Sequence, residues 1–241
     1  MALPKIDAPI YEIDLPLSKK HIRFRPFLVK EQRNLMMAME ANDKETIEKN
    51  IRQVLHNCTL TEGIDVDSLP IIDVEYYFIQ LRARSVGEVV ENKYRCENTV
   101  EEKICNNLME LKLNLLDIKV NINEDVKDII QLTDKIAIKL KYPQFSLIEK
   151  TSKLDDATDM AFQMIVESIE YIFDGQQYYY AKESDPKELL EFVESLNKDQ
   201  FDKIEQFFNN LPKLNKTVNL TCNKCGFKHL IDVEGLESFF D

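Results

Sequence analysis

Four of the five cysteines in this chain form two pairs that lie far apart in the sequence. Cys96 and Cys105 make the first pair, and Cys222 and Cys225 make the second. The residues on either side of each pair are typical of β-strands, so each pair is predicted to lie at the end of a hairpin. If the two hairpins bind one metal ion, the end of the chain is fixed to its middle, and the residues between them form an insertion.

The second pair lies in LTCNKCGF, which has the Cys-x2-Cys-Gly form of a zinc knuckle. In such a knuckle the amides of the turn hydrogen-bond the thiolates, and Gly226 permits the left-handed backbone that closes the turn. Four thiolates hold zinc tetrahedrally and leave no coordination position for a substrate. The sequence therefore predicts a structural zinc site whose ligands are Cys96, Cys105, Cys222 and Cys225.

The first pair leaves alternatives open, because eight residues separate Cys96 from Cys105 instead of two. A longer turn adds little to the entropy of loop closure, so this spacing remains compatible with a shared metal ion. His229, which follows Cys225 closely, is an alternative fourth ligand in place of Cys105, and it equally suits a strand surface. The remaining alternative is four free thiols in a fold held together by ordinary packing.

Length and composition predict one or two globular domains. The chain has 241 residues, of which 44% are hydrophobic and 31% are charged, and this is typical of an ordered globular protein. No apolar run approaches the length of a membrane span. The N-terminal stretch MALPKIDAPIYEIDLP has acids and prolines where a signal peptide needs basic and then apolar residues. We therefore expect a cytosolic chain, in which spaced cysteines are more often metal ligands than disulfides.

The net charge of −12 argues against a nucleic-acid partner, because affinity for a phosphate backbone comes largely from lysine and arginine. Two short basic clusters, from Lys19 to Arg25 and from Arg82 to Arg84, are interpreted as solvated surface. The chain has only five glycines and no phosphate-binding loop motif. No nucleic acid, membrane or small-molecule substrate is expected as a partner.

No residue can be nominated as catalytic. The three histidines, His21, His56 and His229, lie in unrelated settings, and none is paired in sequence with a nucleophile. With 43 acidic residues, a pair of neighbouring carboxylates is expected by chance. Cys58 lies on the apolar stripe of a predicted helix and is interpreted as a core residue. The sequence therefore predicts a protein that is not an enzyme.

The pattern of apolar residues predicts an α+β fold, with helical bundle segments around a small antiparallel β region. HIRFRPF is predicted to be extended, and VGEVVENKYRC, MELKLNLLDIKVNI, IAIKLKYPQF, QQYYYA, TVNLTC and FKHLIDV are predicted strands. Helices are predicted from Val29 (with Leu35, Met36 and Met39 at helical spacing), after an N-cap at Asp43, over 71–85, through 154–172, after an N-cap at Asp185 with Glu188 closing a capping box, and through 201–211.

These elements predict four parts in the chain. Residues 1–85 form an N-terminal strand with a helical segment, and residues 86–122 combine with 212–235 in a β region like a zinc ribbon. Residues 123–211 form an inserted and mostly helical segment between the two hairpins. Residues 236–241 form an aromatic tail.

Two long stretches of the chain resemble one known family. The first is FRPFLVKEQRNLMMAMEANDKETIEKNIRQVLHNCT followed by DVDSLPIIDVEYYFIQLRARSVGEVVE. The second is ELLEFVESLNKDQFDKIEQFFNNLPKL followed by VNLTCNKCGFKHLIDVEGLESFF. In collinear order, both are similar to the baseplate hub subunit family of T-even-type phages. The chain departs from that family at the first cysteine pair, where a closer Cys-x2-Cys is expected.

The resemblance implies a late structural or assembly protein of the contractile-tail baseplate hub. Its expected partners are other hub or tail proteins, and it is expected in the host cytoplasm during assembly and in the virion tail. The expected contact segments are FRPF and the tail residues Phe239 and Phe240. The alternative function is a zinc-ribbon transcription-type factor that binds nucleic acid, and the net charge of −12 disfavours it.

Overall fold

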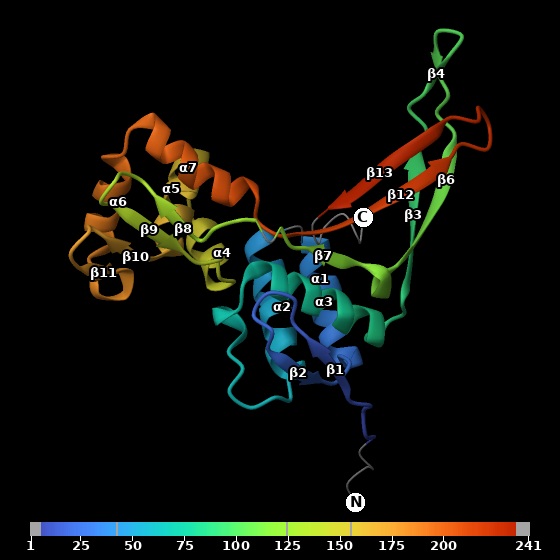
Figure 1. Cartoon of the computed structure of the whole chain (residues 1–241). Coiled ribbons are helices and arrows are strands. Elements are labelled where there is room, and N and C mark those ends of the chain that lie inside the picture. The colour runs from blue at the N-terminus through green and yellow to red at the C-terminus, as the bar shows by residue number, and fades with distance from the viewer. Residues whose placement is uncertain (1–5, 42, 124, 155, 235–241) are drawn as a thin grey trace, which may run out of the picture. The chain divides into compact units, whose positions relative to one another are not determined.

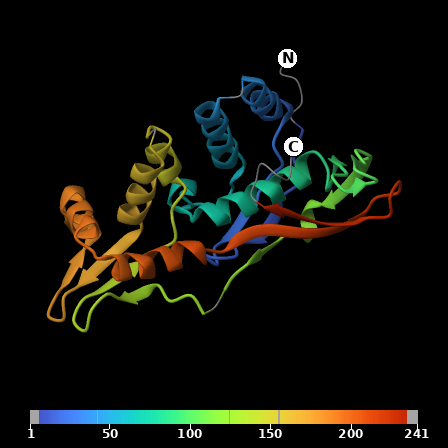
Figure 2. The ribbon, with the colours of Figure 1, turned by 90° about the horizontal axis from the view of Figure 1, so that it is seen from above.

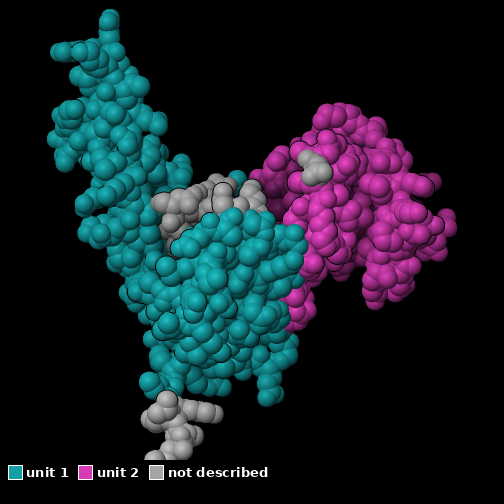
Figure 3. Space-filling view, turned by 180° about the vertical axis from the view of Figure 1, so that it is seen from behind, with its two compact units in different colours: residues 1–64, 72–121, 213–241 teal, residues 65–71, 122–212 magenta. Residues whose placement is uncertain are grey.

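The computed structural model describes residues 6–41, 43–123, 125–154 and 156–234, and the fold is α+β as predicted (Figure 1). The chain divides into two compact units, which Figure 3 shows in different colours. Unit 1 comprises residues 1–64, 72–121 and 213–241, and unit 2 comprises residues 65–71 and 122–212. Unit 1 is therefore built from segments on both sides of unit 2 in the sequence.

The first part of unit 1 is a β-hairpin followed by helices. The hairpin consists of β1 (Tyr11–Asp14) and β2 (His21–Phe24), and the helices are α1 (Val29–Ala41), α2 (Lys44–Cys58) and α3 (Ile71–Ser85). Residues alternate between buried and exposed along β2, so that Ile22 and Phe24 enter the core. The Asp43 side chain accepts a hydrogen bond from the Thr46 N–H, which confirms the predicted cap of α2.

The second part of unit 1 contains the two hairpins that carry the cysteines. The first consists of β3 (Val89–Arg95) and β6 (Leu108–Asn114), with a short arm of β4 (Thr99–Val100) and β5 (Lys103–Ile104) between them. The second consists of β12 (Lys213–Thr221) and β13 (Lys228–Glu234), and β7 (Lys119–Asn121) pairs with β12. Figure 2 shows β12 and β13 side by side as one long hairpin.

One apolar cluster joins these hairpins to α3. It contains residues from β3, β6, β12, β13, α3 and the turn that follows β6, namely Ile79, Ala83, Val90, Leu111, Leu113, Leu115, Ile118, Leu214 and Val233. Because the inward side chains of both hairpins enter the same cluster, the two hairpins pack on each other. This packing holds the cysteine-bearing end of one hairpin beside the cysteine-bearing end of the other.

Unit 2 is a four-stranded antiparallel sheet packed against helices. The strand order is β11-β10-β9-β8, with β8 at Ile129–Gln131, β9 at Ala137–Leu140, β10 at Ile169–Phe173 and β11 at Tyr178–Tyr180. The helices are α4 (Ser146–Thr151), α5 (Ala157–Ser168), α6 (Pro186–Glu194) and α7 (Lys198–Asn209). Ile138 of the sheet and Ile204 of α7 are fully buried in their shared core.

The helix caps of unit 2 agree with the sequence in part. The Asp185 side chain accepts a hydrogen bond from the Lys187 N–H and so caps α6, as predicted. A reciprocal capping box, which was predicted for Asp185 and Glu188, forms instead at α7 between Asn197 and Gln200.

The prediction of one long helix through residues 154–172 was wrong at the C-terminal end of that range. Helix α5 ends at Ser168, and Ile169 and Ile172 lie in strand β10. The segment IEYIF is rich in β-branched and aromatic residues, and it pairs with β9 on one side and β11 on the other. Two apolar residues three positions apart can share a face of a helix, and they can also share a face of a strand that contains a β-bulge. The pairing of β10 with β9 has such a bulge or irregularity between Ile169 and Tyr171.

Two expected surfaces differ from the sequence analysis. Arg25 is not a solvated residue, because its guanidinium makes two hydrogen bonds of 2.9 and 2.8 Å to the buried carboxylate of Glu31. Phe24 and Phe27 of the FRPF segment lie in the core of unit 1. The expected contact residues Phe239 and Phe240 lie outside the described part of the chain.

Among the described helices, none is long and apolar enough to cross a membrane.

Candidate metal centre

The first hairpin places its two cysteines beside each other across its neck. Cys96 directly follows β3, and Cys105 directly follows β5. The Cys96 N–H donates to the Asn107 carbonyl at 2.8 Å, and the Cys105 N–H donates to the Asn98 carbonyl at 2.8 Å. These cross-strand bonds bring the two thiols together although eight residues separate them in the sequence. The short arm of β4 and β5 therefore extends beyond the cysteines without parting them.

The second hairpin forms the turn that its sequence predicts. The Cys222 N–H donates to the Phe227 carbonyl at 2.8 Å, and the Gly226 N–H donates to the Cys222 carbonyl at 2.9 Å. Gly226 has a φ of +74°, in the left-handed region that glycine adopts without strain. The tight turn directs Cys222 and Cys225 toward the first hairpin.

The four thiols from the two hairpins gather in one cluster. The distance between the sulfurs of Cys96 and Cys225 is 3.7 Å, and that between Cys105 and Cys222 is 3.8 Å. All four sulfurs lie within 4.8 Å of one another. A tetrahedral site with metal–sulfur bonds of about 2.3 Å has sulfur–sulfur edges of about 3.8 Å. The arrangement thus has the size of a zinc tetrathiolate site, and it is far wider than a disulfide bond of about 2.05 Å.

Packing closes the cluster to solvent on most sides. Cys96, Cys105 and Cys222 are buried, and Cys225 is half-buried. Apolar side chains from the first hairpin, including Met109 and Tyr94, pack against the thiols. A buried set of four soft ligands suits a thiophilic ion such as zinc and leaves no open position for a substrate.

Hydrogen bonds and burial have opposite effects on the thiols. Backbone N–H groups of Cys225 and Lys224 donate to the Cys222 sulfur, and they lower the pKa of the Cys222 thiol to about 6 against the effect of burial. Burial raises the pKa of Cys96 to about 12 and also raises the pKa of Cys105. A cation would reverse the second effect, since it holds coordinated thiols in the deprotonated form.

Two asparagines that the sequence analysis missed provide further donors to sulfur. The Asn107 Nδ2 lies 3.5 Å from the Cys222 sulfur, and the Asn98 Nδ2 lies 3.7 Å from the Cys225 sulfur. Donors at this distance offset the negative charge that thiolates bring to a buried site. Both asparagines stand two residues after a cysteine of the first pair, and this repeated Cys-x-Asn spacing is the signal that could have identified them.

His229 lies beside the cluster and is not one of its four residues. Its Nε2 is 3.2 Å from the Cys96 sulfur, and its ring packs between the rings of Tyr94 and Phe227, with centroids 5.5 and 4.8 Å away. Cys105, the other candidate for the fourth ligand, is one of the four clustered residues. His229 is therefore in position to hydrogen-bond a Cys96 thiolate.

Cys58, the fifth cysteine, is fully buried in the helical part of unit 1, as predicted. Its sulfur lies 3.9 Å from Glu31 Oε2 and 3.5 Å from Arg25 Nη1. Burial, and after it the Glu31 carboxylate, raises the pKa of the Cys58 thiol to about 12. Cys58 is thus an inert core thiol without a place in the cluster of four.

A model of a known protein family matches most of the chain. The model of the family described as "T4 bacteriophage base plate protein" matches residues 8–241. That range includes both units and all four clustered cysteines. Neither the curated proteins nor the solved structures gave a match.

Proposed function

This chain belongs to the T4 bacteriophage base plate protein family, and from that membership we propose that it is a subunit or assembly factor of the central baseplate hub. The family places it among the structural proteins of the phage tail. The hub role is the finer statement, and the collinear likeness of both halves of the chain to hub subunits supports it. The observation that carries the assignment to the baseplate is the family match over residues 8–241.

The protein would act by contacts with other tail proteins and not by catalysis. The cluster with the most specific chemistry in the described residues is a closed set of thiols, which offers no position for a reacting group. A role through surfaces fits a chain that contains two separately packed units, because each unit can present its own contacts.

We further propose that Cys96, Cys105, Cys222 and Cys225 hold one structural zinc ion. The sulfur–sulfur distances of 3.7 and 3.8 Å, the burial of the thiols and the asparagine donors support this assignment. When bound, the ion would supply a cross-link between two hairpins that are distant in sequence. Zinc is favoured over harder cations because all four ligands are thiolates.

Mass spectrometry of purified tails and of isolated assembly intermediates tests the hub role. We expect this chain in hub intermediates, at a constant ratio to the other hub proteins. A tail protein that is unrelated to the hub should be absent from those intermediates and serves as the control. The proposal is refuted if the chain is found only with peripheral parts of the baseplate or in neither fraction.

A further inference from the structure

Strand β13 is an open edge of its sheet. The strand order β13-β12-β7 gives β13 a neighbour on one side only within the described residues. It pairs with β12 along its whole length, from Lys228 opposite Thr221 to Glu234 opposite Asn215. A strand in this position presents unpaired backbone N–H and C=O groups that can bind a further strand.

The hydrogen bonds of the knuckle show which backbone groups face outward. Because the Cys222 N–H donates to the Phe227 carbonyl, the backbone groups of Phe227 face β12. The direction of these groups alternates along an antiparallel strand. The N–H and C=O groups of Lys228, Leu230 and Asp232 therefore face away from β12, toward the open edge.

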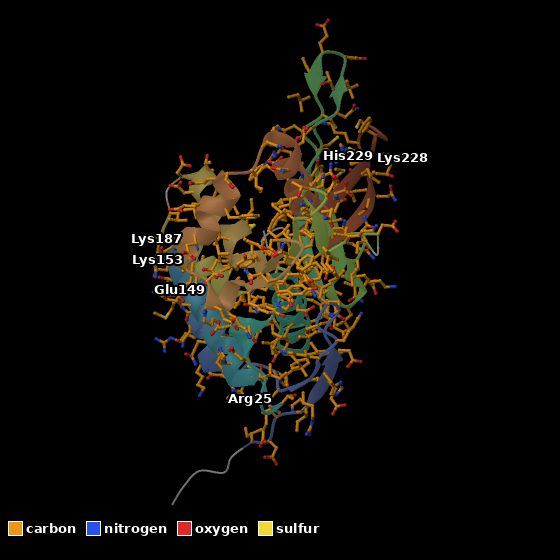
Figure 4. All side chains as sticks on the ribbon, turned by 60° about the vertical axis from the view of Figure 1, so that its left-hand side comes forward. Arg25, Glu149, Lys153, Lys187, Lys228 and His229 are labelled. Carbon is orange, nitrogen blue, oxygen red and sulfur yellow. The ribbon has the colours of Figure 1, made fainter. Side chains whose placement is uncertain are left out.

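The side chains of the same three residues lie on one face of the strand, since residues two apart share a face. All three are exposed, and Leu230 is 66% exposed. Lys228 stands at the beginning of β13, next to the buried His229 (Figure 4). The Asp232 carboxylate accepts a hydrogen bond of 2.6 Å from the Thr217 hydroxyl, which holds it on this outer face. The edge thus carries a cation, an apolar residue and an anion in order.

We propose that this edge binds a second copy of the chain through antiparallel pairing of β13 with β13. With Leu230 opposite Leu230 of the second copy, Lys228 lies opposite Asp232 of that copy, and Asp232 lies opposite Lys228. The two copies are then related by a twofold axis, and every outward-facing backbone group of the three residues has a partner. The pattern of charges complements itself only because lysine and aspartate lie at equal distances from the leucine.

Other registers of the same pairing are less favourable. A shift of two residues in either direction loses the contact between the two leucines and places Leu230 opposite a charged residue, Lys228 or Asp232, although the shift toward the C-terminal end sets Lys228 opposite Glu234. A shift of one residue places the outward-facing backbone groups of one copy opposite backbone groups of the other copy that already hydrogen-bond to β12. A ladder of three residues buries less area than a standard interface, so the expected dissociation constant lies between about 1 µM and about 1 mM.

Sedimentation equilibrium of the full-length, zinc-loaded protein tests the pairing. Each copy has a net charge of −12, so the measurement belongs at about 0.15 M salt, where repulsion beyond about 8 Å is screened. The variants are K228D and D232K, each of which places like charges opposite each other twice, and the double variant K228D/D232K, which restores both pairs. The matched control is K112D, which reverses a lysine on β6 of the other hairpin.

We expect a monomer–dimer equilibrium for the wild type and for K112D. Each single variant should weaken association by about tenfold or more, and the double variant should recover to within about threefold of the wild type. A wild type that stays monomeric throughout the millimolar range overturns the proposal. A double variant no better than either single variant also overturns it. Far-ultraviolet circular dichroism of each variant establishes that it is folded.

Cross-linking gives an independent measure of the register. The Cα atoms of a directly opposed, hydrogen-bonded pair are about 5.5 Å apart, within the span of a disulfide bond. L230C should therefore form a disulfide-linked dimer under mild oxidation, whereas K228C and the wild type should not. Equal yields from L230C and K228C, or no dimer from L230C, contradict the register. The hub role is tested on assembled tails, so its outcome does not depend on this result.

Discussion

Removal of the proposed metal ion is expected to destabilise unit 1 and to leave unit 2 unchanged. The ion would join thiols from two hairpins of unit 1, and the link between Cys105 and Cys222 spans 117 residues of sequence. Residues 122–212 of unit 2 lie inside that span but take no part in the cluster. The perturbations are chelation of the metal and the substitution C222S.

The size of the effect follows from the length of the closed loop. If the link is treated as a single cross-link over 117 residues, it removes about 16 cal/mol/K from the entropy of the unfolded chain, or about 5 kcal/mol at 25 °C. Each kcal/mol shifts the Tm of a domain of this size by about 2–4 °C. The unit 1 transition should therefore fall by about 10–20 °C. This value is a lower bound, because the metal–thiolate bonds stabilise the folded site further.

Differential scanning calorimetry with elemental analysis measures both quantities on one sample. We expect close to one equivalent of zinc in the wild type, a lower first transition after chelation, and no further effect of chelation on C222S. The matched control is C58S, which changes a buried thiol outside the cluster and should retain the zinc. The reasoning is refuted if the metal-free and zinc-loaded proteins unfold at the same temperature.

Three further predictions concern other parts of the fold. E31Q should destabilise unit 1 by about 3 kcal/mol, because the Arg25 guanidinium loses its carboxylate partner. Burial alone would raise the pKa of Glu31, but the hydrogen bonds from Arg25 and the Leu28 N–H lower it. Stability from Glu31 is thus fully present above the ordinary carboxyl pKa and is lost as the pH falls through the lower, folded value. Urea titrations at pH values from 7 downward through the acid range should show this loss in the wild type and not in E31Q. G226A should cost about 1 kcal/mol through its φ of +74° alone, since no atom lies within 4 Å of an added Cβ, and a chelator competition assay should show weaker zinc binding. I204A should destabilise unit 2 by about 2–5 kcal/mol without any loss of zinc, and zinc loss in this variant would contradict the independence of the two units.

The sequence was sufficient for features that depend on local chemistry. Asp43 and Asp185 were recognisable as helix caps because a short acidic side chain before an amphipathic run accepts hydrogen bonds from the first turn. The helix over 71–85 was predicted with its observed bounds. The knuckle around Gly226 was recognisable because few sequences permit so tight a turn between two thiols.

Features that depend on distant partners were not predictable in the same way. Ile169 and Ile172 become strand residues only because β9 and β11 are available to pair with β10. Arg25 resembled a surface cation until the fold placed the buried Glu31 beside it. The exposure of Met36 and Met39 on α1 likewise depends on which helices pack against that face. The division of the chain into four parts stays a prediction.

The fourth residue of the cluster, for which the sequence left Cys105 and His229 as candidates, depends on both local chemistry and distant partners. Sequence spacing favoured neither residue, because a turn of eight residues can close in many ways. The position of Cys105 beside Cys96 depends on the hydrogen bonds from the Cys105 N–H to the Asn98 carbonyl and from the Cys96 N–H to the Asn107 carbonyl.

The discontinuous build of unit 1 has a consequence for synthesis on the ribosome. Cys105 is translated 117 residues before Cys222. Cys96 and Cys105 therefore lack their partner thiols while residues 122–212 are translated. At about 5–20 residues per second, this interval lasts roughly 6–23 s. Unit 2 can fold during that time, whereas the cysteine cluster can close only after residues 213–234 leave the exit tunnel. The nascent chain therefore carries Cys96 and Cys105 without their partner thiols until the hairpin of β12 and β13 has been made.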